Sequence, residues 1–314
     1  MNLFPYDSKF DFMRLRKVSV GLAIALLVIA IGALATRGLN FALDFTGGTV
    51  VELKFDQEAD VGQLRERLTT AGYEDAVVQT FGASNDIVVR LQPEEGQTNA
   101  NQTGDSVLAA VQSADNPAKL IRSDFVGPQV GKELASQGVW AVLFVSLAFL
   151  VYISARFERK FAVAAILATM HDIVICTGYF AITGKEFDLN VLAGILSVMG
   201  YSINDTIVVF DRVRENFRSL HRVEPYEVLN RSVNQTLSRT IITSLVAFLS
   251  GLALYLYGGG SLEGMALSQM IGIVIGTISS IFVACPLLTL GFLKVTKQDL
   301  MPKAKDEALL ARRP

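Results

Sequence analysis

Six long apolar segments, separated by polar stretches, set the pattern of this chain. An α-helix needs about 20 apolar residues to cross the hydrocarbon core of a bilayer, and each segment is close to or above that length. The pattern therefore predicts a polytopic α-helical membrane protein with six transmembrane helices. The segments cover approximately residues 17–36, 134–153, 161–182, 189–210, 239–257 and 265–293.

The first apolar segment, 17–36, has some features of a secretory signal, because Ala33-Leu34-Ala35 resembles a cleavage site. Its apolar run is nevertheless longer than the apolar part of a signal peptide. We therefore interpret 17–36 as a retained transmembrane helix that follows a short N-terminal segment, residues 1–16.

Residues 37–133, between the first two spans, have the pattern of a soluble domain. The order strand, helix, strand, strand, helix, strand predicts an α+β domain of the ferredoxin-like type, βαββαβ. The polar stretch 93–105 has nothing to bury, so we predict a flexible loop there. The expected strands are 49–55, 75–81, 86–91 and 119–126, and the expected helices are 61–71 and 106–113.

The fourth span combines an apolar face with a polar one. A helical projection places Gly194, Val198, Tyr201, Ser202 and Asp205 on one side of the helix. A charged side chain at the centre of a span costs about 2.5–3.5 kcal/mol on insertion scales, so it is expected to face other protein. The opposite side of the projection is apolar and consists of Leu196, Met199, Ile203, Ile207 and Phe210.

Arg239 opens the fifth span and is the predicted partner of Asp205. A buried carboxylate that loses its cation can take up a proton, so such a pair can act as a proton relay. The same pair can also be a fixed ion pair that only sets helix packing, and chemistry alone does not separate the two. We interpret Asp211 as an interfacial anchor. The supporting polar candidates are His171, Asp172, Asn204, Tyr201 and Ser202.

Small residues recur at every fourth position of the sixth span. This spacing is typical of close helix packing, and we interpret it as a packing stripe rather than a chemical site. The stripe consists of Gly272, Gly276, Ser280 and Ala284.

Basic residues predict the orientation of the spans. Nineteen Lys and Arg residues flank one side of the membrane, whereas Lys185 alone lies in the two short loops on the other. The positive-inside rule therefore predicts that the N-terminus 1–16, the loop 211–238 and the basic tail 294–314 are cytoplasmic, with the domain 37–133 outside. Pro225 predicts the start of a helix that continues into span five. The basic residues of this loop can serve as topology signals or contact lipid headgroups or polyanions.

Composition agrees with a membrane protein and excludes several functions. Apolar residues make up 51% of the chain and charged residues 18%, with a mean hydropathy of +0.41 and a net charge of −2. This charge predicts no nucleic-acid partner. Cys176 and Cys285 lie in predicted spans and are interpreted as buried apolar residues. The spacing of His171 and His221 fits no metal site, and no phosphate-binding loop is present, so we predict no enzyme activity, metal or cofactor.

Five motifs, in order along the chain, resemble those of the SecF family, the smaller half of the bacterial SecD–SecF complex in the resistance-nodulation-division superfamily. Gly47 and Gly48 lie in the first motif, and their glycine backbones fit either a hinge or a tight start of a strand. The motifs are LDFTGGT at 43–49, DFVGPQVG at 124–131, MHD at 170–172, GYSINDTIVVFDR at 200–212 and TLSRT at 236–240.

The resemblance implies a subunit of the bacterial inner membrane that pairs with SecD, associates with the SecYEG channel and often with YajC, and acts on translocating preproteins. It implies that the proton motive force drives late-stage export, with Asp205 and Arg239 as proton-path residues. Two alternatives remain: half of a proton-coupled solute or lipid exporter, or a structural assembly subunit. Six spans and one outer domain of about a hundred residues favour half of a heterodimer over a complete exporter.

Overall fold

The computed structural model describes residues 8–81, 83–92, 100–220 and 223–296, which form two compact units, a helical bundle and an α+β unit. Six helices are long and apolar enough to cross a membrane, which confirms the predicted number of spans. They are α1 (Arg16–Thr36), α5 (Pro128–Arg156), α6 (Arg159–Thr183), α7 (Leu189–Ser219), α8 (Pro225–Tyr257) and α9 (Gly260–Ser279).

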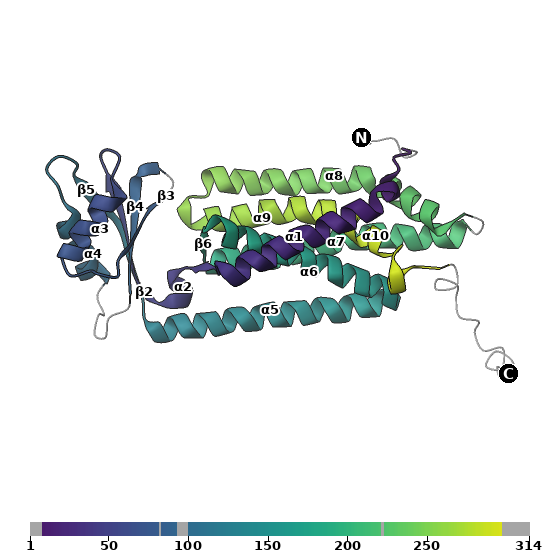
Figure 1. Cartoon of the computed structure of the whole chain (residues 1–314), viewed down its shortest axis with the longest axis horizontal. Helices are drawn as coiled ribbons and strands as arrows, with labels where there is room; N and C mark the ends of the chain where they lie inside the picture. The colour runs from purple at the N-terminus through teal and green to yellow at the C-terminus, as the bar shows by residue number, and fades with distance from the viewer. Residues whose placement is uncertain (1–7, 82, 93–99, 221–222, 297–314) are drawn as a thin grey trace. The chain divides into compact units, whose positions relative to one another are not determined.

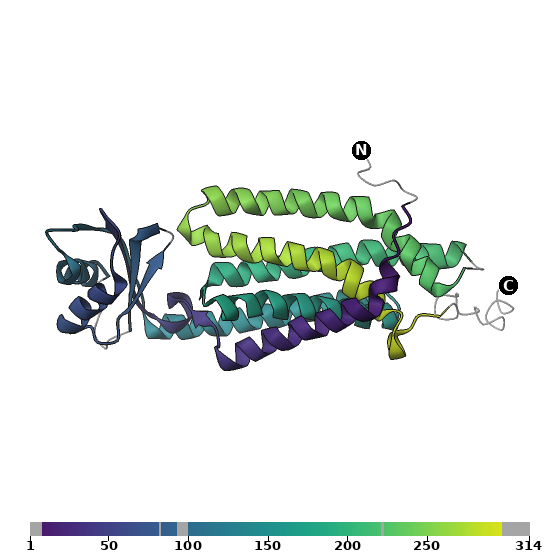
Figure 2. The ribbon, with the colours of Figure 1, turned by 45° about the horizontal axis from the view of Figure 1, so that its top comes forward.

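The long helices of the bundle lie side by side in both views (Figures 1 and 2). Helices α6, α7 and α9 form its interior, where α9 packs against both α6 and α8. Helices α1 and α8 lie outside and expose apolar side chains such as Val18 and Val246, as expected for surfaces that meet lipid or another protein. The apolar side of α7 is also enclosed, because Met199, Ile203 and Phe210 are buried.

Helices α7 and α8 extend well beyond the predicted spans. Helix α7 continues to Ser219, and α8 begins with Pro225 in its first turn, as the sequence predicted. Most of the predicted loop 211–238 is therefore a helical hairpin, with residues 221 and 222 outside the described residues.

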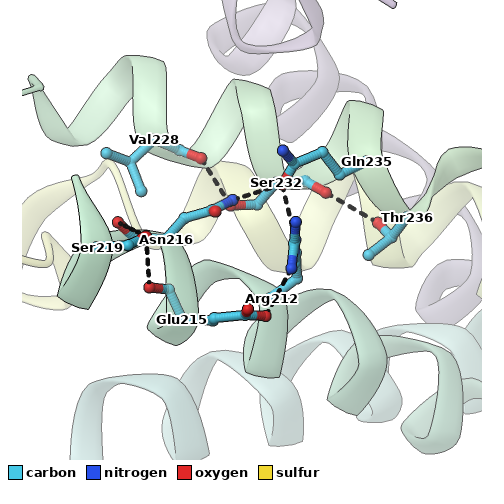
Figure 3. A network of polar contacts seen from close by, with 8 residues as sticks. All are labelled: Arg212, Glu215, Asn216, Ser219, Val228, Ser232, Gln235 and Thr236. Atoms are coloured by element: carbon cyan, nitrogen blue, oxygen red, sulfur yellow. Dashed lines mark hydrogen bonds and ion pairs between the residues drawn. The ribbon is translucent and has the colours of Figure 1, made fainter. Parts of the chain in front are cut away.

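A network of side-chain hydrogen bonds joins the two arms of this hairpin (Figure 3). Asn216 Nδ2 donates to Ser232 Oγ and to Gln235 Oε1, each at 2.8 Å. Arg212 Nε donates to the same Gln235 oxygen at 2.7 Å. Because Asn216 and Ser232 are buried, these bonds satisfy polar groups that would otherwise be costly, and they fix the register of α7 against α8.

The segment that precedes α1 is docked on α8. Phe10 N donates to Asn234 Oδ1 at 3.0 Å, and Asn234 Nδ2 donates to Phe10 O at 2.8 Å. One turn away on α8, Asn230 accepts from Met13 N, and the Met13 side chain is fully buried. The described part of the predicted segment 1–16 is therefore tied to the start of the fifth span.

The prediction of one continuous helix over 265–293 is wrong. Helix α9 ends at Ser279 and passes into a π-helical turn, Ser280–Ala284, followed by the short α10 (Cys285–Leu287). Pro286 has no N–H and its ring crowds the preceding turn, so ordinary α-helical hydrogen bonding cannot continue through this position. Residues 297–314 of the predicted tail lie outside the described residues.

The α+β unit follows the predicted element order. Its sheet has the strand order β3-β4-β2-β5, with every neighbouring pair antiparallel. Helices α3 and α4 cover one face of this sheet (Figures 1 and 2) and bury Val51, Leu53, Leu68, Val89 and Val107 against it. The elements are β2 (Gly48–Phe55), α3 (Val61–Thr70), β3 (Val77–Phe81), β4 (Ala83–Leu91), α4 (Ala100–Val111) and β5 (Ala118–Val126).

Two boundaries of the α+β unit differ from the prediction. Helix α4 begins at Ala100, so the second half of the predicted flexible loop 93–105 is helical, and residues 93–99 lie outside the described residues. Strand β4 begins at Ala83 rather than residue 86, because its first residues continue to pair with β3.

The two glycines of the first motif lie at the start of the sheet. The short helix α2 (Leu43–Thr46) ends at Gly47, whose φ is +71°, and β2 begins at Gly48 with a φ of +118°. A Cβ on Gly48 would overlap the carbonyl oxygen of Leu91 on the neighbouring strand. This geometry is that of a tight start of a strand; a hinge role remains a prediction.

The segment between α6 and α7 belongs to the α+β unit, which the sequence pattern did not predict. Strand β6 (Glu186–Phe187) pairs with β1 (Asn40–Phe41), and Glu186 forms an ion pair with Arg90 of β4. Leu189 N donates to Asp44 Oδ2 at 3.1 Å.

Candidate functional site

Asp205 lies where three helical segments of the bundle meet. Its side chain belongs to α7 and the residue is 5% exposed. Thr240 Oγ1 of α8 donates to Asp205 Oδ1 at 2.8 Å, and Ser280 Oγ of the π turn donates to Oδ2 at 2.6 Å. Both carboxylate oxygens are thus held by neutral hydroxyl groups, which can donate to an ionised carboxylate and accept from a protonated one.

Glycines let α9 approach α7 closely enough for this contact. A Cβ on Gly272 would overlap the Val198 side chain, and one on Gly276 would lie 3.1 Å from Ser202 Cβ. These contacts confirm the predicted packing stripe for both glycines. The same prediction is wrong for Ser280, because its hydroxyl is a direct ligand of the Asp205 carboxylate.

Arg239 does not contact Asp205 in this structure. Its residue is exposed, and the interactions of the described residues include no ion pair between the two side chains. Successive residues of an α-helix point about 100° apart, so when Thr240 faces Asp205 its neighbour Arg239 turns away. The direct pairing that the sequence predicted is therefore replaced by a hydroxyl contact.

A second buried carboxylate, Asp172 of α6, lies close to the first. It is fully buried; its Oδ1 is 2.9 Å from His171 Nδ1, and its Oδ2 accepts from Ser202 Oγ at 2.6 Å. Ser202 and Asp205 are three residues apart on α7 and share one face. The structure thus brings together His171, Asp172 and Ser202, three of the supporting candidates.

The remaining predicted residues lie elsewhere. Tyr201 Oη donates to Ser244 Oγ at 2.9 Å, on the side of α7 that faces α8. Asn204 is exposed, so its prediction as a support of the site is wrong for this arrangement. Asp211 accepts two hydrogen bonds from Arg156, at 2.8 and 2.7 Å, and its side chain is about two-fifths exposed. It pairs with arginine at the end of the bundle, as expected of an anchor.

Thr240→Val should destabilise the bundle by about 1–3 kcal/mol, because the substitution keeps the volume but leaves a buried carboxylate oxygen without its donor. Thermal unfolding of the purified full chain in detergent measures the effect. Thr243→Val, one turn along α8, is the matched control, since the exposed Thr243 hydroxyl donates only to backbone carbonyls. Equal effects of the two substitutions would show that the Asp205 contact contributes nothing.

The fold and the two buried carboxylates define a multi-pass membrane protein with a polar centre inside its bundle, and comparison with known families agrees. Residues 106–293 match the family described as protein export membrane protein SecD/SecF, C-terminal, and residues 32–59 match the SecD/SecF GG motif. The protein translocase subunit SecF of Pseudomonas aeruginosa is 47% identical over 299 residues, covering 94% of this chain and 95% of the relative. SecF of Escherichia coli O157:H7 is 44% identical, covering 88% and 86%.

Solved structures point to the same family. SecDF of Thermus thermophilus, a translocon-associated membrane protein, is 36% identical with a TM-score of 0.83, and SecDF in a super-membrane-facing form is 37% identical with a TM-score of 0.66. They cover 91% and 90% of this chain, which spans about two-fifths of each SecDF chain, 39% and 38%. The chain belongs to the SecF family of protein translocase subunits.

Proposed function

We propose that this chain, paired with SecD, uses the proton motive force to assist late-stage preprotein export through SecYEG, with YajC as a further partner. Asp205 carries the proton, and Arg239 approaches it in another conformation. Both termini are cytoplasmic, the α+β unit is outside, and its strand order supports a ferredoxin-like domain. Moving one charge through 100 mV supplies about 2.3 kcal/mol, enough to bias a conformational equilibrium about fiftyfold.

The observation that carries this proposal is the environment of Asp205. It is a buried carboxyl group held by two hydroxyls and by no cation among the described residues. Such a group can bind and release a proton without first breaking an ion pair. Arg239 is next to Thr240, so a turn of α8 about its axis exchanges a neutral partner for a cationic one.

The two solved SecDF chains support a change of arrangement. They are nearly equal in sequence identity to this chain, but their TM-scores differ, 0.83 against 0.66. Chains of this fold therefore adopt more than one arrangement of their parts, which a mechanism driven by Asp205 protonation requires.

Arg239→Ala should reduce proton-gradient-dependent export about tenfold or more, while the variant still co-purifies with SecD. Arg239→Lys is the matched control, since it keeps the charge and should retain part of the activity. Export and co-purification are measured in the same complemented strain. Loss of co-purification would instead support a structural assembly subunit, and unchanged export would contradict the proposed role of Arg239.

A further inference from the structure

A cavity of about 350 Å³ opens on the side of the bundle between α1, α6 and the end of α9. Its wall is almost entirely apolar, with Val18, Leu22 and Ile278 among the residues at its mouth. Three polar side chains, Ser19, His171 and Ser279, also line it. The hydroxyl of Ser19 is bonded to the backbone of its own helix, whereas the other two polar groups are not so satisfied.

His171 Nε2 and Ser279 Oγ are both buried and have no hydrogen-bond partner within the described chain. Ser279 is 1% exposed, so bulk solvent does not satisfy its hydroxyl. More than nine in ten buried polar groups in proteins have a partner, which can be an ordered water. Two unsatisfied polar atoms on the wall of one cavity therefore indicate a small polar occupant, and a water molecule needs only two to four such partners.

The other side of the His171 ring is fully engaged. Its Nδ1 lies 2.9 Å from Asp172 Oδ1, and the second oxygen of Asp172 is held by Ser202. An ionised carboxylate accepts hydrogen bonds only, so Nδ1 carries the hydrogen and Nε2 presents its lone pair to the cavity. The buried pair then has a net charge of −1.

We propose that His171 is a second proton-binding residue of this chain, which exchanges its proton with a water held between Nε2 and Ser279 Oγ. The proton adds to the lone pair of Nε2, and the only bond that breaks is an O–H bond of the hydrated proton. Nδ1–H stays bonded to Asp172, and the charge of the pair changes from −1 to 0. A neutral pair is the less costly state inside a membrane bundle.

The charged and titratable surroundings of this pair are few. The α1 and α9 residues that line the cavity have no ionisable side chains. On α6, the buried Cys176 donates its S–H to Ser268 O, and on α7 the nearest acid is Asp205, three residues from Ser202. Asp172 is thus the charge that decides whether His171 is protonated.

The arrangement places the second site next to the first. Ser202 and Asp205 belong to one face of α7, and the consecutive residues Ser279 and Ser280 face the cavity and Asp205, respectively. A change of charge at His171 and Asp172 therefore acts on the helices that hold Asp205. This link to transport rests on the proposed function, whereas proton binding by His171 does not.

The chain has two histidines, so a direct test is available. In the full-length chain paired with SecD in lipid nanodiscs, ¹⁵N-histidine NMR of the His221→Gln variant reports His171 alone; His171→Asn verifies the assignment. Between pH 5 and 8.5 the signal should change from protonated to neutral imidazole. At pH 6 the ratio of protonated to neutral ring should fall about tenfold in Asp172→Asn. Ser279→Ala should weaken the transfer of magnetisation from water to the ring.

An imidazole that stays in one state across this pH range would overturn the proposal, as would equal titration with and without the Asp172 carboxylate. The first measurement needs no substitution at the site, so a variant that fails to fold does not block the test. Export by Asp205→Asn is a separate readout. A titrating His171 together with an unaffected Asp205→Asn strain would reject the proposed function but retain this site.

Discussion

Asp205→Asn is expected to abolish the part of preprotein export that depends on the proton gradient, a fall of about tenfold or more. Asparagine keeps the shape of the side chain: its oxygen can accept from Thr240 and its amide can donate to Ser280 Oγ, so the bundle should remain folded. What the substitution removes is the ability to take up and release a proton. Export is measured in a strain that lacks its own SecD–SecF complex, with and without an uncoupler.

Asp211→Asn is the matched control for this experiment. It changes an acid two helical turns away on the same helix, which pairs with Arg156 and is partly exposed. Exposed ion pairs contribute about 0–1 kcal/mol, so its effect on export should be small. If the Asp205→Asn strain still lost export on addition of the uncoupler, as the unmodified strain does, the proton would have to travel by another route.

Gly48→Ala should be the most destabilising single change in the α+β unit, costing more than about 3 kcal/mol. A φ of +118° costs an L-residue about 1–3 kcal/mol. In addition, the new Cβ would overlap the carbonyl oxygen of Leu91, so β2 and β4 would have to separate where Thr49 pairs with Leu91. Hydrogen–deuterium exchange of these two strands in the full-length chain measures the loss.

Gly72→Ala separates the two contributions. Gly72 also has a positive φ, +97°, but a Cβ there meets no atom within 4 Å. Its cost should therefore stay near the backbone term alone, about 1–3 kcal/mol. Equal losses at both positions would mean that the close approach of Gly48 to Leu91 is absent in solution.

The hydrophobic pattern was sufficient for the spans and for the face of α7 that carries Asp205, because length and periodicity determine both. The partners of Asp205 were not predictable in the same way. A Thr or Ser hydroxyl in a helix usually bonds to its own backbone, so nothing local marks Thr240 or Ser280 as a ligand. The preference for Arg239 over Thr240 came from charge, whereas the structure selects between adjacent residues by helical phase.

The small-residue stripe of the sixth span illustrates the same limit. Spacing by four predicted one packing surface, and this holds for Gly272 and Gly276, which lie in regular helix. Ser280 begins a wider turn, where the same spacing no longer keeps a residue on the same face. The proline that accompanies this turn follows it in sequence, so the break was visible only in the three-dimensional structure.

The π-helical turn at Ser280–Ala284 also affects how insertions and deletions act in this chain. Such a turn holds one residue more than an α-helical turn of the same height. Deleting one residue there would restore regular α-helix but would rotate all that follows by about 100° relative to α9. Cys285 and Leu288, both buried against the bundle, would leave their places. A one-residue gap in this segment is therefore a large structural change, whereas the same gap in an exposed loop is a small one.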